Sequence, residues 1–173
     1  MTSDILKTIL GSKRKPKEKT AELVEAVVRK EIPTREFLDF FRNASKTERG
    51  PCADAMKHIS EKSPELLAPL IDELIPCITD PLPRVKWGVQ EAIGNLSGRY
   101  PQDAARAVPK LLLNTEDPST VVRWCAAYAL SEIAKHNATI RKTLVPKIEN
   151  ILKREENNGV RMVFVKTLKA INK

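Results

Sequence analysis

Four segments of this chain repeat one another at nearly even intervals, and this repetition constrains the fold more than any other feature. They begin at Glu48, Val85, Val122 and Val160. The second residue of each is basic, and it recurs after 37, 37 and 38 residues. A period of this size is typical of chains whose helical units stack one on another.

Each copy carries the same apolar stripe, with the spacing of one helix face. In the second copy the stripe is Val85, Val89, Ala92, Ile93 and Leu96; in the third, Val122, Ala126, Ala129, Leu130 and Ile133; in the fourth, Val160, Phe164, Thr167, Leu168 and Ile171. The first copy keeps Cys52, Ala55, Met56 and Ile59. We therefore predict one amphipathic helix per copy.

A second helix is predicted before each of the last three, over residues 64–78, 101–115 and 139–155. Pro69, Pro109 and Pro146 fall inside these segments. Because proline has no backbone N–H and crowds the preceding turn, each should bend its helix or restart it locally. With only 6 glycines against 12 prolines, the chain favours helices punctuated by proline.

An acidic residue stands six positions before each of the last three repeated cations. The pairs are Asp80 with Lys86, Asp117 with Arg123, and Glu155 with Arg161, while Asn43 takes the place before Arg49. A carboxylate in the turn and a cation in the following helix can bond along a stack of repeats. We interpret these residues as a structural ladder in which Asp117 is the partner of Arg123.

These residues resemble HEAT repeats. The resemblance rests on Asp80 with Val85-Lys86 and Ala92-Ile93-Gly94, and on Asp117 with Val122-Arg123 and Ala129-Leu130. It implies an all-α fold, a right-handed α-α superhelix of about four to five helix pairs.

The resemblance covers residues 33–173, where repeats are expected at about 33–61, 64–98, 101–135 and 138–173. Residues 1–32 are expected to form N-terminal capping helices, 2–10 and 17–31, joined by a basic loop over 11–19.

In proteins that resemble this family, the second helix of each pair lines the inner, concave side. Removing the apolar stripe and the ladder cation leaves one outward row: Gly50, Pro51, Asp54 and His58; then Trp87, Gly88, Glu91 and Asn95; then Trp124, Cys125, Tyr128 and Glu132; then Met162, Val163, Lys166 and Ala170. Both tryptophans and one of the two tyrosines of the chain fall on this row.

Two interpretations of this row stay open. Large aromatic side chains on an exposed row indicate a binding patch, with Trp87, Glu91, Trp124, Tyr128, Met162 and Lys166 as contacts for a protein or peptide partner. Alternatively, the indoles cover the repeat junctions and complete the packing. The first interpretation predicts a scaffold without catalytic residues, and we place it first.

Nucleic-acid binding is the alternative function. Both ends of the chain are basic, the middle is slightly acidic, and the net charge is +8. Lys13, Arg14, Lys15 and Lys17 could contact phosphate or an acidic partner. Some HEAT-like solenoids resemble alkylpurine DNA glycosylases, which use a basic, concave cleft. Trp87, Trp124 and Glu91 could fit such a cleft, but no catalytic residue of that family can be matched in this sequence.

The sequence contains no motif for metal binding, phosphate binding or nucleophilic catalysis. His58 and His136 stand at no metal-ligand spacing, and neither a phosphate-binding glycine loop nor a nucleophile motif is present. We expect no metal, no cofactor and no membrane partner. The three cysteines, at no short spacing, and the lack of a signal peptide predict a cytoplasmic protein, or a nuclear one if the source is eukaryotic.

Overall fold

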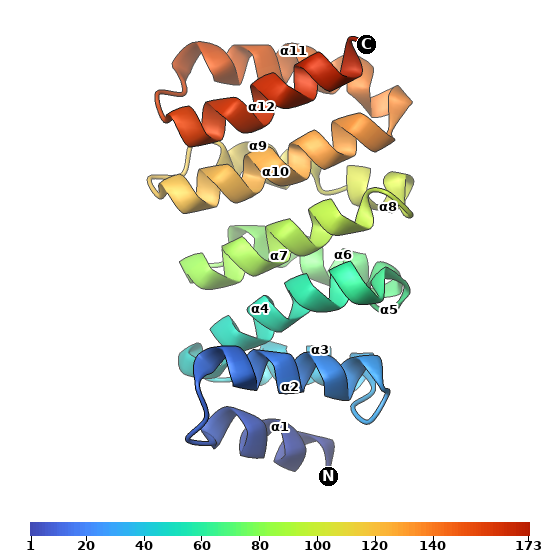
Figure 1. Ribbon diagram of the computed structural model, residues 1–173, viewed down its shortest axis with the longest axis vertical. Coiled ribbons are helices and arrows are strands. Elements are labelled where there is room, and N and C mark those ends of the chain that lie inside the picture. Colours follow the sequence, from blue (N-terminus) through green and yellow to red (C-terminus); the bar gives the residue numbers. More distant parts are fainter.

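The computed structural model describes all residues, 1–173, and contains helices but no strands. Its front row (Figure 1) consists of α2 (Pro16–Val28), α4 (Lys46–Lys62), α7 (Pro83–Leu96), α10 (Thr120–His136) and α12 (Asn158–Ile171). Each front helix packs against the next one along the row. Helices of successive repeats therefore lie side by side although they are far apart in sequence.

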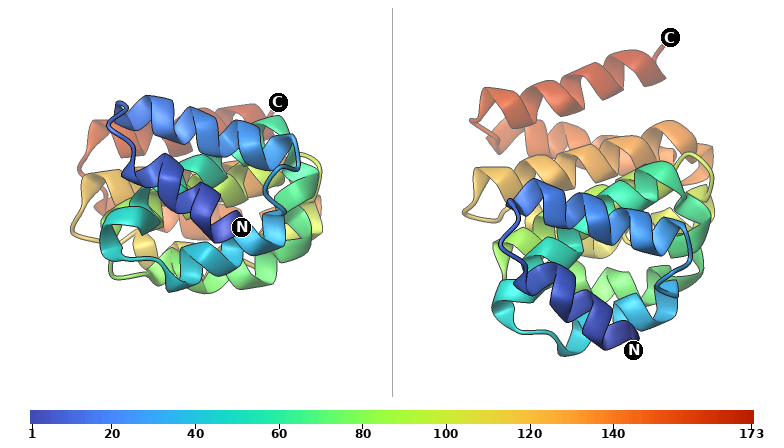
Figure 2. Two further views of the ribbon diagram at one scale, coloured as in Figure 1. Left: turned by 90° about the horizontal axis from the view of Figure 1, so that it is seen from below. Right: turned by 60° about the horizontal axis from the view of Figure 1, so that its bottom comes forward.

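A back row lies behind the front helices (Figure 1). It contains α3 (Thr34–Asn43), the segment of residues 64–79, α8 (Pro101–Ala105), α9 (Val108–Asn114) and α11 (Ala138–Arg154). Helix α1 (Thr2–Gly11) lies at the N-terminal end of the stack, in contact with α2 and α3 (Figure 2). The all-α class predicted from the repeats is thus confirmed.

The predicted apolar stripes form the core between the two rows. All five stripe residues of α7, from Val85 to Leu96, are fully buried, as are the five of α10. In α4, Cys52, Ala55, Met56 and Ile59 are also fully buried. In α12 the stripe fades toward the chain end, where Leu168 and Ile171 are only half-buried.

Prolines interrupt two of the three back-row segments in which they were predicted to bend or restart a helix. Residues 64–79 form α5 (Pro64–Leu67), a 3-10 turn η1 (Ala68–Leu70) that contains Pro69, α6 (Ile71–Leu74) and a 3-10 turn η2 (Ile75–Thr79). A break also precedes Pro109, between α8 and α9. Helix α11 is assigned as one helix through Pro146, with Leu144 buried before the proline and Ile148 and Ile151 buried after it.

The N-terminal loop is shorter than the predicted range of 11–19. Helix α2 begins at Pro16, a residue suited to the first helical position, and the Glu18 carboxylate accepts from the Lys15 N–H at 3.1 Å. Only residues 12–15 lie between the helices. Helix α2 ends at Val28 because Lys30 adopts a left-handed conformation (φ 62°) that turns the chain into α3.

The ladder of charges exists, but its pairing differs from the predicted one. Three ion pairs join neighbouring repeats: Arg49 with Asp80 at 2.5 Å, Lys86 with Asp117 at 2.6 Å, and Arg123 with Glu155 at 2.9 Å. Each cation lies on the side of its helix that meets the next repeat. Its nearest carboxylate is therefore in the following turn, not in the turn six residues before it.

The predicted Asp117–Arg123 side-chain pair is accordingly wrong. The Arg123 guanidinium touches Asp117 only through the backbone, by donating to its carbonyl oxygen at 3.0 Å. Arg161 has no carboxylate partner and donates to the carbonyl oxygens of Leu152 and Glu155. Asn43 donates to the carbonyl oxygen of Asp39 and stays outside the ladder.

Each ladder carboxylate also stabilises the turn in which it lies. Asp80, Asp117 and Glu155 accept from the backbone N–H two residues further on, at 2.9, 2.8 and 2.9 Å. Burial raises the pKa of Asp117, but hydrogen bonds from Lys86 and from the Ser119 N–H outweigh it and lower the pKa below its ordinary value. The pKa of Glu155 is lowered in the same way, by Arg123 and the Asn157 N–H against the effect of burial.

The ladder predicts a loss of stability in acid. A carboxyl whose pKa is lower in the folded state stabilises that state fully above its unfolded pKa, about 3.9 for Asp and 4.3 for Glu. This contribution is lost as the pH falls through the lowered folded values. Urea unfolding between about pH 6 and 3 should show the decline. The double variant Asp117→Asn/Glu155→Gln should be less stable at pH 6 and show a flatter decline. If the pH dependence of unfolding is unchanged in that variant, the loss of stability in acid does not come from Asp117 and Glu155.

Candidate functional site

The front row brings the predicted aromatic residues onto one face of the molecule. Trp124 on α10 is 38% exposed and Met162 on α12 is 46% exposed. Val121, one turn before Trp124, is 48% exposed, although the row derived from the sequence did not include it. These three side chains lie on neighbouring helices. Lys166, one turn after Met162, is also exposed.

Tyr128 stacks on Trp124 and is held firmly in place. The two rings are parallel to within 1°, with centroids 5.8 Å apart. The Tyr128 hydroxyl donates to Asn95 Oδ1 at 2.5 Å, and Asn95 Nδ2 donates to Ser60 Oγ at 2.9 Å. Burial, followed by the charge of Glu132, raises the pKa of Tyr128 to about 12, so the hydroxyl stays protonated at neutral pH. The pair therefore presents a rigid aromatic surface.

Trp87 occupies the equivalent position on α7, but its surroundings differ from those of Trp124. Its side chain is half-buried, and its indole N–H is shielded from solvent with no hydrogen-bond acceptor. The outward position predicted for both tryptophans therefore leads to substantial exposure only at Trp124. Trp87 is partly a packing residue, whereas Trp124 lies open at the surface.

Other residues of the predicted row belong to the packing. Gly88 and Cys125 are buried, because neighbouring front helices approach each other closely there. Glu91 links three helices: it pairs with Lys57 of α4 at 2.9 Å and lies 3.5 Å from the Cys125 Sγ of α10. Burial, followed by the charge of Glu91, raises the pKa of the Cys125 thiol well above its ordinary range.

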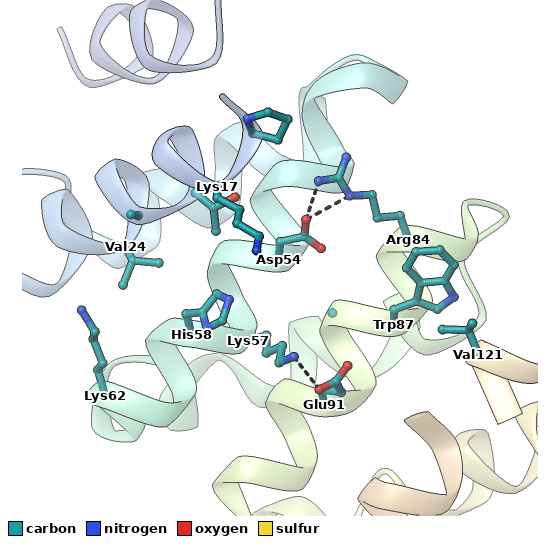
Figure 3. A pocket seen from close by; sticks show the side chains of 14 residues that line it. Lys17, Val24, Asp54, Lys57, His58, Lys62, Arg84, Trp87, Glu91 and Val121 are labelled. Carbon is teal, nitrogen blue, oxygen red and sulfur yellow. Dashed lines mark hydrogen bonds and ion pairs between the residues drawn. The ribbon is translucent and has the colours of Figure 1, made fainter. Parts of the chain in front are cut away.

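A groove of about 620 Å³ lies on the front face, between α2, α4 and α7 (Figure 3). Val121 of α10 closes one end beside Trp87, and Val24 and Lys62 lie at the opposite side. Cations from three helices line it: Lys17, Lys57, Lys62 and Arg84. Asp54 and Glu91 are its carboxylates, and both are engaged by cations of the groove itself.

Arg84 is the most firmly fixed cation of the groove. Its Nε donates to Asp54 Oδ2 at 3.0 Å, and its Nη2 donates to the same oxygen at 2.5 Å. Its aliphatic stem lies over Gly50, where a Cβ atom would come within 2.7 Å of the Arg84 Cδ. The repeat pattern did not identify Arg84, because Arg84 precedes Val85, the first residue of the repeated segment. The role of Arg84 also depends on α4, which belongs to the preceding repeat.

The basic residues predicted near the N-terminus separate into two groups. Lys17 lines the groove, whereas Lys13, Arg14 and Lys15 lie on the loop before α2 and are exposed. Arg14 is paired with Glu22. Of the four, only Lys17 reaches the site formed by the front row.

The cations of α11 lie in the back row, and two of them are used within the fold. Arg141 donates to the carbonyl oxygens of Ala134 and Lys135, both at 2.7 Å, at the end of α10. Arg154 pairs with Glu116 at 3.3 Å and donates to Thr115. These two guanidinium groups stabilise helix ends and a turn.

No group of three His, Cys, Asp or Glu side chains is arranged to hold a metal ion. None of the helices combines the length and apolar character needed to cross a membrane.

Comparison with known proteins identifies the architecture. The HEAT repeat family model matches residues 107–137, which contain α9 and α10. A designed armadillo repeat protein in complex with the peptide (KR)4 superposes with a TM-score of 0.76 at 19% identity, over 98% of this chain and 81% of that one. The chain is a HEAT/armadillo-like α-solenoid.

Other solved structures agree on this fold. Computationally designed armadillo repeat proteins for modular peptide recognition align with a TM-score of 0.70 at 20% identity, over 90% of the solenoid and 69% of their own length. An engineered protein aligns with a TM-score of 0.71 at 17% identity, over 97% and 79%. At these identities the similarity concerns the fold alone. No curated protein matches the sequence of the solenoid.

Proposed function

We propose that the solenoid is a non-catalytic scaffold that binds a peptide segment of a protein partner on its front face. The observation that carries the proposal is the exposed apolar group on α10 and α12, formed by Val121, Trp124 and Met162 beside the stacked Tyr128. Aromatic residues held rigidly at a surface are favoured interface anchors, because little side-chain entropy is lost when they are covered.

The groove and the aromatic surface adjoin at Val121, and together they offer an extended track across the front helices. Lys166 would form part of its polar rim. Glu91 would act indirectly, by fixing Lys57 and the three helices that it links. Two of the similar designed proteins are described by their peptide complex or by peptide recognition, which supports a peptide as the ligand class.

Selection from a displayed peptide library tests this proposal. Peptides selected on the wild-type solenoid should bind the variant Trp124→Ala about tenfold or more weakly, since interface anchors contribute about 2 kcal/mol or more. The stability cost should stay near 1 kcal/mol, because Trp124 is exposed and mainly loses its contact with Tyr128.

Leu113→Ala is the matched control. Leu113 is a large apolar residue, 64% exposed, on α9 of the back row. Its replacement should leave the affinity of the selected peptides unchanged. If no peptide is enriched, or if both variants weaken binding equally, the front face is not the binding surface.

A further inference from the structure

We infer that the groove between α2, α4 and α7 receives an acidic segment, a stretch of chain bearing Asp or Glu side chains. This inference rests on the proposed function and specifies the chemistry of the partner. The charges of the groove carry it: four cations, Lys17, Lys57, Lys62 and Arg84, face two carboxylates, Asp54 and Glu91.

The two carboxylates of the groove are already satisfied. Asp54 accepts two hydrogen bonds from Arg84, and Glu91 pairs with Lys57 (Figure 3). A cationic ligand would have to displace one of these internal partners. An anionic ligand can bind Lys17 and the Nη1 group of Arg84 without displacing an internal partner of the groove.

Lys17 is the first available cation. It extends from the first turn of α2 into the groove and forms no ion pair (Figure 3). Lys62 lies on the far side from Trp87 and pairs with Glu25, but both side chains of that pair are largely exposed, 53% and 44%. Exposed ion pairs of this kind contribute little free energy, so Lys62 can exchange Glu25 for a carboxylate of the ligand.

Arg84 supplies the directional contact. Asp54 and the packing over Gly50 hold its guanidinium in one orientation, and its Nη1 group has no protein acceptor. A guanidinium fixed in advance loses little entropy on binding a carboxylate, and charge-assisted hydrogen bonds are stronger than neutral ones. Arg84 is therefore the expected anchor, with Lys17 beside it.

The form of the groove favours a peptide over a nucleic acid. Its volume is about 620 Å³, within the range of pockets that bury most of a drug-sized ligand. Trp87, Val24 and Val121 line it as well, and they can cover the aliphatic parts of a peptide. A duplex needs a larger and more uniformly basic surface, without carboxylates in its path.

Fluorescence polarisation with labelled octapeptides tests the inference. The probes are an alternating Asp-Glu peptide, a neutral Gln-Asn peptide, a basic Lys-Arg peptide and a short DNA duplex. At physiological salt, the acidic peptide should bind the wild-type solenoid about tenfold more tightly than each of the others. Lys17→Glu should weaken its binding about tenfold. Arg84→Lys, which keeps the charge but loses the planar fork, should also weaken it.

Lys142→Glu is the matched control for net charge. Lys142 is exposed on α11 in the back row, and its reversal should change the affinity of the acidic peptide by less than about twofold. Equal losses for Lys17→Glu and Lys142→Glu would reveal a general charge effect and overturn the inference. It is also overturned if the neutral peptide, the basic peptide or the duplex binds as tightly as the acidic peptide.

These outcomes separate the two proposals. If library selection yields non-acidic peptides that depend on Trp124, the scaffold function stands and the acidic preference falls. If the selection enriches no peptide and the acidic octapeptide does not bind, both fall.

Discussion

Replacing Gly88 by alanine is expected to lower the free energy of unfolding by at least about 3 kcal/mol, at the upper end of the cost of overpacking. Gly88 lies where α7 crosses α4, directly against the backbone of Ala53. A Cβ atom there would overlap the Ala53 carbonyl group and lie 2.9 Å from the Ala53 Cβ. The clash is with backbone, so no side-chain rotation relieves it, and the two helices must move apart.

Thermal or urea unfolding measures this effect, and a loss of about 3 kcal/mol should lower the melting temperature by roughly 10 °C. Gly11→Ala is the matched control, because no heavy atom lies within 4 Å of the Cβ position at Gly11. At the end of α1 that change should be neutral or slightly stabilising, since alanine restricts the unfolded chain more than glycine does. Equal stability of the two variants would show that α4 and α7 are less closely packed than described.

Arg123→Ala should cost about 3 kcal/mol, the lower end of the cost of breaking a buried ion pair. The Arg123 guanidinium makes two contacts with Glu155, at 2.9 and 3.3 Å, and donates to the Asp117 carbonyl oxygen at 3.0 Å. The Glu155 side chain is only 4% exposed, against 20% for Arg123. Removing the cation therefore leaves a carboxylate with little access to water.

Arg161→Ala provides the comparison, because Arg161 takes the same repeat position but donates only to backbone carbonyl oxygens. We expect it to cost about 1 kcal/mol, the usual contribution of a hydrogen bond. Urea unfolding at neutral pH measures both variants. In neither variant should peptide affinity change, since the ladder lies outside the groove. A larger loss for Arg161→Ala than for Arg123→Ala would contradict the pairing between repeats.

The proposed binding surface could be predicted only in part from the sequence. Trp124, Tyr128 and Met162 lie where helical periodicity predicts, because the direction of a side chain from a helix depends on residue spacing alone. Trp87 shares that direction with Trp124, yet its indole N–H is shielded. Its exposure depends on what the neighbouring helices place around it, and the period does not contain that information.

The sequence by itself determined the helices, their apolar stripes and the all-α repeat architecture. Each of these follows from local spacing: about 3.6 residues per turn within a helix, and a nearly constant interval between copies. The stripe residues Val85, Val89 and Ile93 are buried because only one face of their helix is apolar.

The tertiary structure decided everything that depends on two repeats at once. It pairs Lys86 with Asp117 and leaves Arg123 to Glu155, and it places Gly88 against Ala53. It also assembles the groove from α2, α4, α7 and one residue of α10. The physical reason is that the distance and rotation between stacked helices set which side chains meet across a junction. These quantities result from the packing of whole surfaces, so no interval within one repeat encodes them.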